Sequence, residues 1–278
     1  MTAVQSLSGG TAVEDPVAED RLSRRRGLRP GQILKPLVVF VAAIVLWQVL
    51  VDTNALPNFE VASPTQTGSY LGSHPGLLLS NTGTTLEEVA LAFVLALAGG
   101  VVLAALINHF KLLEEAVLPL LVVSQVIPSI AIAPLLVLLL GFGMAPKVVV
   151  AAIISFFPIL VNTLAGLKGV SGDMANLSRA LGTTPLRNLR LFTLPNALPF
   201  IFAGARVAVT LSVIGAVVGE FVTAKNGLGY LILAGSSQLN PPLMLSALVV
   251  LAVMGIVLFS AVRIIEHLAL PWVRIGRP

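Results

Sequence analysis

Six stretches of apolar residues dominate this 278-residue sequence. A transmembrane helix needs about 20 consecutive, mainly apolar residues, and most of the stretches have about that length. They lie near residues 33–51, 89–107, 116–140, 148–167, 198–219 and 243–262. Only 11% of the residues are charged, whereas a soluble domain has about 25%. The sequence therefore predicts an all-α membrane protein with about six transmembrane helices.

The positions of the lysine and arginine residues predict how these helices are oriented. If the N-terminus is cytoplasmic, 14 of the 17 basic residues lie in cytoplasmic segments. Only Lys147 and Lys225 lie in outer loops, and Arg206 lies inside a span. Cytoplasmic loops of membrane proteins carry an excess of basic residues. We therefore expect both termini to be cytoplasmic.

The chain divides into a membrane domain and two short tails. Residues 1–32 are polar and charged without helical or strand periodicity, which predicts a disordered cytoplasmic tail. Residues 33–270 form the predicted transmembrane domain, with its core at about 81–268. Residues 271–278 are expected to be a cytoplasmic C-terminal tail.

No catalytic or metal-binding pattern occurs in the sequence. It lacks the G-x-x-x-x-G-K-[ST] phosphate-binding loop, has no cysteine, and its three histidines lie far apart. We therefore expect no enzymatic activity and no cofactor or metal in this chain. The pairs Glu87–Glu88 and Glu114–Glu115 precede the second and third apolar stretches, where we expect them to complement helix dipoles.

Polar residues gather on the third, fourth and fifth predicted spans. The spacing of Gln125 from Ser129, and of Ser155 from Asn162, predicts a polar stripe on one face of each helix. Such residues either line a polar pathway or form hydrogen bonds between helices. Arg206 either extends toward the nearby interface or faces a pore or a subunit interface. The candidates for lining a pathway are Gln125, Ser129, Ser155, Asn162, Thr163, Arg206, Thr210 and Glu220.

The loop of residues 168–196 has the pattern of two short amphipathic helices. Asp173 is a good N-cap for a helix over about 174–181, and Gly182 can end that helix in a left-handed conformation. Thr184 can cap a second helix with Pro185 at its first position, and Leu194-Pro195 is expected to end it. These helices could lie on lipid headgroups or dock into a groove of a partner, and their amphipathic pattern fits both.

One spacing in this loop resembles a known motif. The motif is E-A-A-x3-G-x9-I-x-L-P. This chain has Asn176-Leu177-Ser178, then three residues and Gly182, then nine residues and Phe192, then one residue and Leu194-Pro195. That motif belongs to permease subunits of binding-protein-dependent ABC importers. Three further stretches resemble one branch of these permeases, the nitrate, sulfonate and taurine branch, which includes permeases for thiamine-pyrimidine precursors and riboflavin. The stretches are FFPILVNTLAGLKGV, ALPFIFAGARVAVTLSVIGAVVGEF and GLGYLI. The resemblance covers about residues 34–274.

The resemblance implies a type I ABC importer permease in the inner or plasma membrane of a prokaryotic cell. Its implied partners are an ATPase subunit that binds ATP, an outer solute-binding protein, a second permease copy and membrane lipid, with no nucleic acid. The implied solute is a small anion or heterocycle. The implied contacts with the ATPase are Asn176, Leu177, Arg179, Gly182, Leu186, Arg187, Arg190, Leu194 and Pro195.

The alternative is a secondary transporter or channel without an ATPase partner. A secondary transporter often has acidic residues near the membrane midplane and inverted structural repeats. None of the six predicted spans carries a central Asp or Glu. The sequence therefore favours the importer permease.

Overall fold

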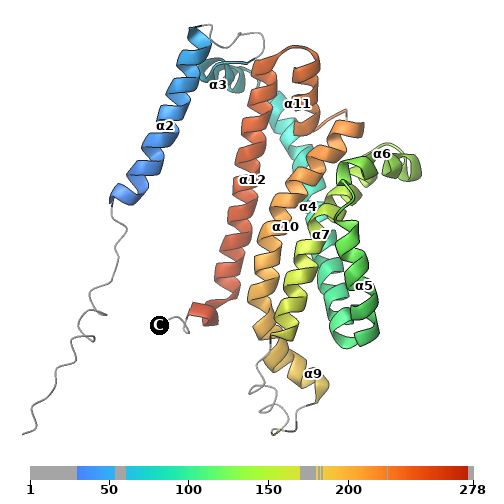
Figure 1. The fold of residues 1–278 in the computed structure, drawn as a ribbon. Helices are drawn as coiled ribbons and strands as arrows, with labels where there is room; N and C mark the ends of the chain where they lie inside the picture. The colour runs from blue at the N-terminus through green and yellow to red at the C-terminus, as the bar shows by residue number, and fades with distance from the viewer. Residues whose placement is uncertain are drawn as a thin grey trace, which may run out of the picture. The chain divides into compact units, whose positions relative to one another are not determined.

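The computed structural model describes residues 30–53, 61–169, 180, 182, 184–223 and 225–274. Every regular element in those ranges is a helix (Figure 1), as the sequence predicts. The elements are α2 (Pro30–Asp52), α3 (Pro64–Ser73), α4 (Pro75–His109), α5 (Lys111–Ser124), α6 (Ser129–Leu140), α7 (Met144–Lys168), α9 (Pro185–Asn188), a π-helix (Leu189–Thr193), α10 (Leu194–Thr223), α11 (Leu228–Ser237), α12 (Pro241–Ala269) and a 3₁₀ helix (Pro271–Arg274).

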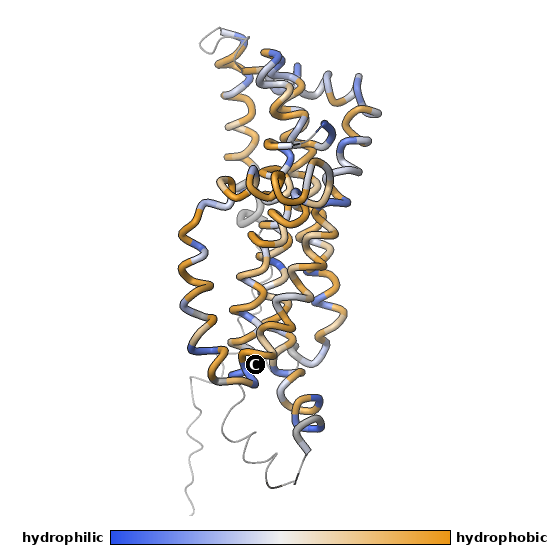
Figure 2. Tube along the Cα trace, turned by 90° about the vertical axis from the view of Figure 1, so that its right-hand side faces the viewer, coloured by the Kyte–Doolittle hydropathy of each residue, from blue (hydrophilic) through white to orange (hydrophobic). Residues whose placement is uncertain are grey.

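The described helices contain four that are long and apolar enough to span a membrane. These are α4, α7, α12 and the helix over Leu189–Thr223, which joins the π-helix to α10. The pair α5 and α6 counts as a fifth span if it crosses as one bent unit. Hydrophobic residues run along the length of these helices (Figure 2). The predicted number of six spans and the cytoplasmic position of both termini stay predictions.

Helix α2 belongs to a separate compact unit and is described by itself. Residues 1–50 form one unit and residues 51–278 form the other. Over Val38–Asp52, α2 is a shorter apolar helix. Its role as the first of six spans is therefore a prediction from the sequence.

The third apolar stretch is not one straight helix. It forms α5 and α6, whose axes differ by 101° across a short break. The last turn of α5 tightens, because the N–H groups of Gln125, Val126 and Ile127 each donate to a carbonyl three residues earlier. Pro128 then cannot donate a backbone hydrogen bond, and α6 begins at the next residue. The tightened last turn of α5 and the missing N–H of Pro128 together explain the sharp turn between α5 and α6.

Helices α7 and α10 pack closely at the centre of the second unit. A Cβ added to Gly215 of α10 would lie 2.5 Å from the Cα of Ala151 on α7. At Gly204 the added Cβ would lie 2.9 Å from the carbonyl oxygen of Pro158. Small residues at a helix interface let two backbones approach each other. These glycines therefore allow the central contact of the fold.

Helix α4 begins much earlier than its apolar stretch. It starts at Pro75, although hydropathy places the span at about 89–107. The hydroxyl group of Thr82 donates to the carbonyl oxygen of Leu78 one turn back, so this polar side chain has a partner inside the helix. Glu87 and Glu88 therefore lie inside α4, and the prediction that they complement the dipole at a helix start is wrong.

The second unit has two ends, and each carries different features. Helix α9 and the C-terminal end of α12 lie at one end, called the α9 end (Figure 1). Helices α3 and α11 lie at the opposite end, called the α11 end. Helices α4, α7 and α10 run between the two ends.

Candidate coupling surface and transport pathway

The chain enters the α10 span from the α9 end without a break in the helix. Helix α9 begins as predicted, because the N–H of Asn188 donates to the carbonyl of Thr184 at 2.9 Å. The prediction that Leu194-Pro195 ends this helix is wrong. The chain passes from α9 through the π-helix, where the N–H of Leu194 donates to the carbonyl of Leu189. A wide π-turn relieves the crowding that a proline causes against the preceding turn, so Pro195 can lie inside the helix.

Beyond Pro195 the helix is fixed to α7. The side-chain Nδ2 of Asn196 donates to the carbonyl of Gly166 at 2.9 Å. Ala197 is fully buried against Leu164 and Leu167. A Cβ added to Gly166 would lie 2.9 Å from the Cα of Ala197, so the two backbones touch. The start of α10 is therefore anchored.

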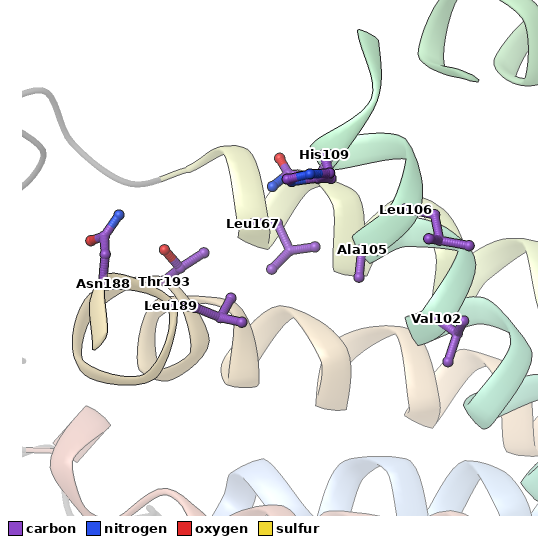
Figure 3. A pocket seen from close by; sticks show the side chains of 9 residues that line it. Val102, Ala105, Leu106, His109, Leu167, Asn188, Leu189 and Thr193 are labelled. Carbon is purple, nitrogen blue, oxygen red and sulfur yellow. The ribbon is translucent and has the colours of Figure 1, made fainter. Parts of the chain in front are cut away.

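The segment before Pro195 is much more open. Leu189 and Leu191 are 45% and 52% exposed. Beside them lies a cleft of about 630 Å³. Figure 3 shows Leu189 and Thr193 at this cleft, together with Leu106 and His109 from α4. Apolar side chains on both sides of the cleft are thus uncovered in this chain alone.

The predicted ATPase contacts fall partly within the described residues. Gly182 has a φ of +57°, the left-handed conformation that the sequence predicts for it. Arg187 and Arg190 are exposed, and neither forms an ion pair with another described residue. Asn176, Leu177 and Arg179 lie outside the described residues. Leu186 lies in α9, and Leu194-Pro195 opens α10.

The pathway candidates of α7 lie between the middle of the helix and its C-terminal end. Ser155 is buried and donates to the carbonyl of Ala151 at 2.6 Å. Asn162 donates to the carbonyl of Pro158 at 2.8 Å. Both side chains thus bond within α7 rather than between helices. Thr163 is buried, and its hydroxyl has no hydrogen-bond partner among the described residues.

Gln125 and Ser129 do not share a helix face, so the predicted stripe is wrong at this position. Gln125 follows the last residue of α5, and Ser129 is the first residue of α6, on the two sides of the sharp bend. Gln125 lines a cavity of about 330 Å³ together with Phe156 of α7 and Leu95 of α4. The end of α5 therefore places Gln125 at a cavity beside α4 and α7.

Arg206 has a partner that the sequence did not reveal. Its guanidinium donates to the carboxylate of Glu266 on α12 at 2.8 Å, and both side chains are partly exposed. Thr210 lies one turn further along α10 and is exposed. It borders an apolar groove of about 570 Å³ between α10 and α12.

Glu220 lies in a buried hydrogen-bond network at the α11 end. The hydroxyl of Thr85 on α4 donates to Glu220 Oε1 at 2.7 Å. The N–H of Gly229 donates to Glu220 Oε2, and the N–H of Leu228 donates to the Thr85 hydroxyl at 2.8 Å. Glu220 thus caps the first turn of α11 and joins it to α4 and α10.

A buried ion pair that the sequence did not indicate lies beside this network. Lys147, in the first turn of α7, pairs with Glu88 of α4, and both side chains are buried. The sequence placed Lys147 in an outer loop because it flanks an apolar stretch. We call Thr85, Glu88, Lys147 and Glu220 the buried charge cluster. The available signal was the presence of two ionisable residues at the edges of two apolar stretches of the sequence.

The comparisons with known proteins decide the family. Residues 96–274 match the family described as "Binding-protein-dependent transport system inner membrane component". The chain belongs to this family. It is therefore a membrane permease of the ABC importer type, and the resemblance noted in the sequence is confirmed.

Relatives and solved structures agree with the family assignment. The permease is 34% identical to "Formylaminopyrimidine transport permease protein ThiX" of Halalkalibacterium halodurans, over 88% of this chain and 98% of the relative. It is 35% identical to "Riboflavin transport system permease protein RibX" of Chloroflexus aurantiacus, over 84% of this chain and 88% of that relative. A solved structure of the MetNI methionine ABC transporter in an inward-facing conformation matches with a TM-score of 0.62 at 21% identity, over 69% of this chain and 95% of that chain. The permease therefore has the type I importer fold.

Proposed function

We propose that this permease forms the solute pathway of an ABC importer and is driven by a separate ATPase through the loop of residues 168–196. One observation carries the proposal. The helix runs unbroken from Pro185 at the α9 end to Thr223 at the α11 end. A displacement of α9 by a bound partner would therefore act on the helical segment that leads into a membrane span.

The surface of this loop suits a protein partner. Arg187 and Arg190 are exposed cations without ion-pair partners among the described residues, and they can contact carboxylates of an ATPase. ATP would bind to the ATPase subunit, so this chain needs no nucleotide site of its own. Solute would arrive from a binding protein docked at the α11 end.

A second permease copy would complete the pathway. Gln125 and Thr210 are exposed on the surface of this chain. A pathway that they line therefore needs a second subunit to separate it from lipid. Symmetric pairs are the commonest oligomers, and we propose a homodimer.

The proposed solute is a small anion or a heterocycle. Two relatives that match most of this chain are named for transport of a formylaminopyrimidine and of riboflavin. Both solutes are nitrogen heterocycles. We therefore place a heterocycle first and an anion such as a sulfonate or nitrate second.

Reconstitution tests the proposed function. The permease would be placed in proteoliposomes with its ATPase and its solute-binding protein, and solute uptake would be measured. We expect uptake only with ATP and with all three components. Uptake without the ATPase, driven by an ion gradient, would show a secondary transporter instead.

Cysteine labelling tests the pathway. The chain has no cysteine, so single substitutions Gln125→Cys and Thr210→Cys create unique labelling sites. We expect small aqueous thiol reagents to reach both sites, at rates that change when nucleotide binds the ATPase. Val253→Cys is the control, because Val253 is exposed on an apolar face of α12 that we expect to contact lipid. Equal labelling at all three sites would remove Gln125 and Thr210 from the pathway.

A further inference from the structure

The π-helix of Leu189–Thr193 lies between two parts of the chain that are restrained very differently. On its C-terminal side, Asn196 and Ala197 fix α10 to α7 by a hydrogen bond and by direct backbone contact. On its N-terminal side, α9 carries the exposed Arg187. A π-turn holds one residue more than the corresponding α-turn, and such turns are frequent at functional sites. Its position at this boundary calls for a functional account.

The cleft beside the π-helix gives this segment room to move. The cleft has a volume of about 630 Å³ and lies between Leu189 and Thr193 on one side and the end of α4 on the other. Leu106 of α4 and Leu189 are 43% and 45% exposed, so apolar surface is uncovered on both sides (Figure 3). Closing the cleft would bring these apolar side chains into van der Waals contact. The open and closed cleft are therefore two states that one site can adopt.

A regular α-helix could not use this room. If α9 and α10 formed one straight α-helix, a rotation of α9 would turn the start of α10 as well. That rotation would break the hydrogen bond of Asn196 to Gly166 and separate two backbones that touch. A segment with one extra residue can absorb the rotation instead.

We propose that the π-helix of Leu189–Thr193 is a register hinge between the ATPase-docking helix α9 and the anchored span α10. When the segment passes its extra residue toward α9 and becomes α-helical, α9 turns by about 100° and shifts by about 1.5 Å relative to α10. This turn moves Leu189 relative to Leu106 and changes the width of the cleft. The inference rests on the proposed function, because it takes α9 to be the part that the ATPase moves.

A one-residue deletion tests the hinge. A variant that lacks Leu191 has no extra residue, so its helix is locked in the α-register. Leu191→Ala is the matched control, because it removes the same side chain but keeps the length. We expect the deletion variant to retain the ATPase and its ATP hydrolysis while solute uptake falls at least tenfold. We expect Leu191→Ala to retain uptake within twofold of the unchanged permease.

Other results of the deletion would overturn the hinge. Normal uptake would show that the extra residue has no role in coupling. An equal loss of uptake in Leu191→Ala would assign the effect to the side chain. Loss of the ATPase with normal amounts of permease in the membrane would show that the segment only sets a fixed docking surface.

Cross-linking gives a second test that does not depend on how well the deletion variant folds. Leu106→Cys and Leu189→Cys would be combined and joined across the cleft with a reducible bifunctional thiol reagent. We expect the yield of the cross-link to differ at least threefold between nucleotide-free and ATP-bound complexes. We also expect cross-linking to stop uptake until a reductant is added, and the two single-cysteine variants to be unaffected. An equal yield in both nucleotide states would overturn the hinge.

The unchanged complex separates this inference from the proposed function. If the unchanged permease neither binds the ATPase nor imports solute, the proposed function fails. If it does both and the hinge tests are negative, only the hinge fails.

Discussion

The two ends of this permease use the same three helices in opposite ways. At the α11 end, α4, α7 and α10 bring Glu88, Lys147 and Glu220 into a buried cluster in which every residue contacts a polar partner. At the α9 end, α4 and α7 face an open cleft, and the charged Arg187 and Arg190 point to no described partner. The first end fixes the helices together, whereas the second leaves apolar and charged surface uncovered.

The contrast has an energetic consequence. A buried charge that loses its partner is strongly destabilising, but an exposed residue with few contacts can usually change at little cost. Substitutions at the α11 end should therefore act on the stability of the permease. Substitutions at the α9 end should act on coupling while the fold persists.

Lys147→Met should have the largest effect on stability. It leaves the carboxylate of Glu88 buried without its cation, which costs about 3–5 kcal/mol. The measurement is the free energy of unfolding of the purified permease in detergent. Lys225→Met is the control, because Lys225 is exposed and should lose about 0.5 kcal/mol or less.

The ion pair can be tested further with a double variant. Combining Lys147→Met with Glu88→Gln removes both charges, so it should recover part of the stability that Lys147→Met loses. If Lys147→Met is as stable as Lys225→Met, the two ends do not differ in the way described here.

Gly227→Ala should have the next largest effect. Gly227 has a φ of +116°, and a Cβ there would overlap the carboxylate of Glu220. We expect a loss of about 1–3 kcal/mol from the backbone conformation, increased by the collision. Gly83→Ala in α4 is the control, since nothing lies within 4 Å of its added Cβ. It should stabilise the helix by up to about 1 kcal/mol. Equal effects of the two substitutions would contradict the packing around Glu220.

The ion pair of Arg206 with Glu266 should have the smallest effect. Its side chains are 35% and 19% exposed, so solvent screens the interaction. A double-mutant cycle with Arg206→Ala and Glu266→Ala should give a coupling free energy of about 0.2–1 kcal/mol. A coupling free energy as large as that of Glu88 with Lys147 would show that exposure does not decide the difference between the two pairs.

Local features of the fold were predictable from the sequence. Long apolar runs indicated the spans α7, α10 and α12, because a helix in lipid must be apolar along its length. Thr184 and Pro185 marked the start of α9, and Gly182 marked a left-handed residue. Each of these features depends on residues that are close together in the sequence, so it can be predicted from the sequence alone.

Features that depend on distant residues were not predictable. Glu88 and Lys147 lie 59 positions apart, and hydropathy assigned each of them to the edge of a different span. The partner of Arg206 lies 60 positions away. The continuation of the helix through Pro195 was also missed, because a proline is usually read as a helix end and the π-helix that precedes it has no local sequence signal.

The most direct test of the account compares two glycines at opposite ends of the permease. Gly182 and Gly141 have φ values of +57° and +79°, and no atom of the described residues lies within 4 Å of an added Cβ at either position. Gly182→Val and Gly141→Val each force a β-branched residue to a positive φ, one in the proposed ATPase-docking loop and one at the turn between α6 and α7. Gly141 also has a ψ of 179°, in a region that essentially only glycine adopts, so Gly141→Val is a stringent control. Both variants would be purified with the ATPase, and the amount of bound ATPase would be measured. We predict that Gly182→Val loses the ATPase and solute uptake together at normal permease levels, while Gly141→Val retains the ATPase. Retention of the ATPase and normal uptake in Gly182→Val would contradict the assignment of the coupling loop.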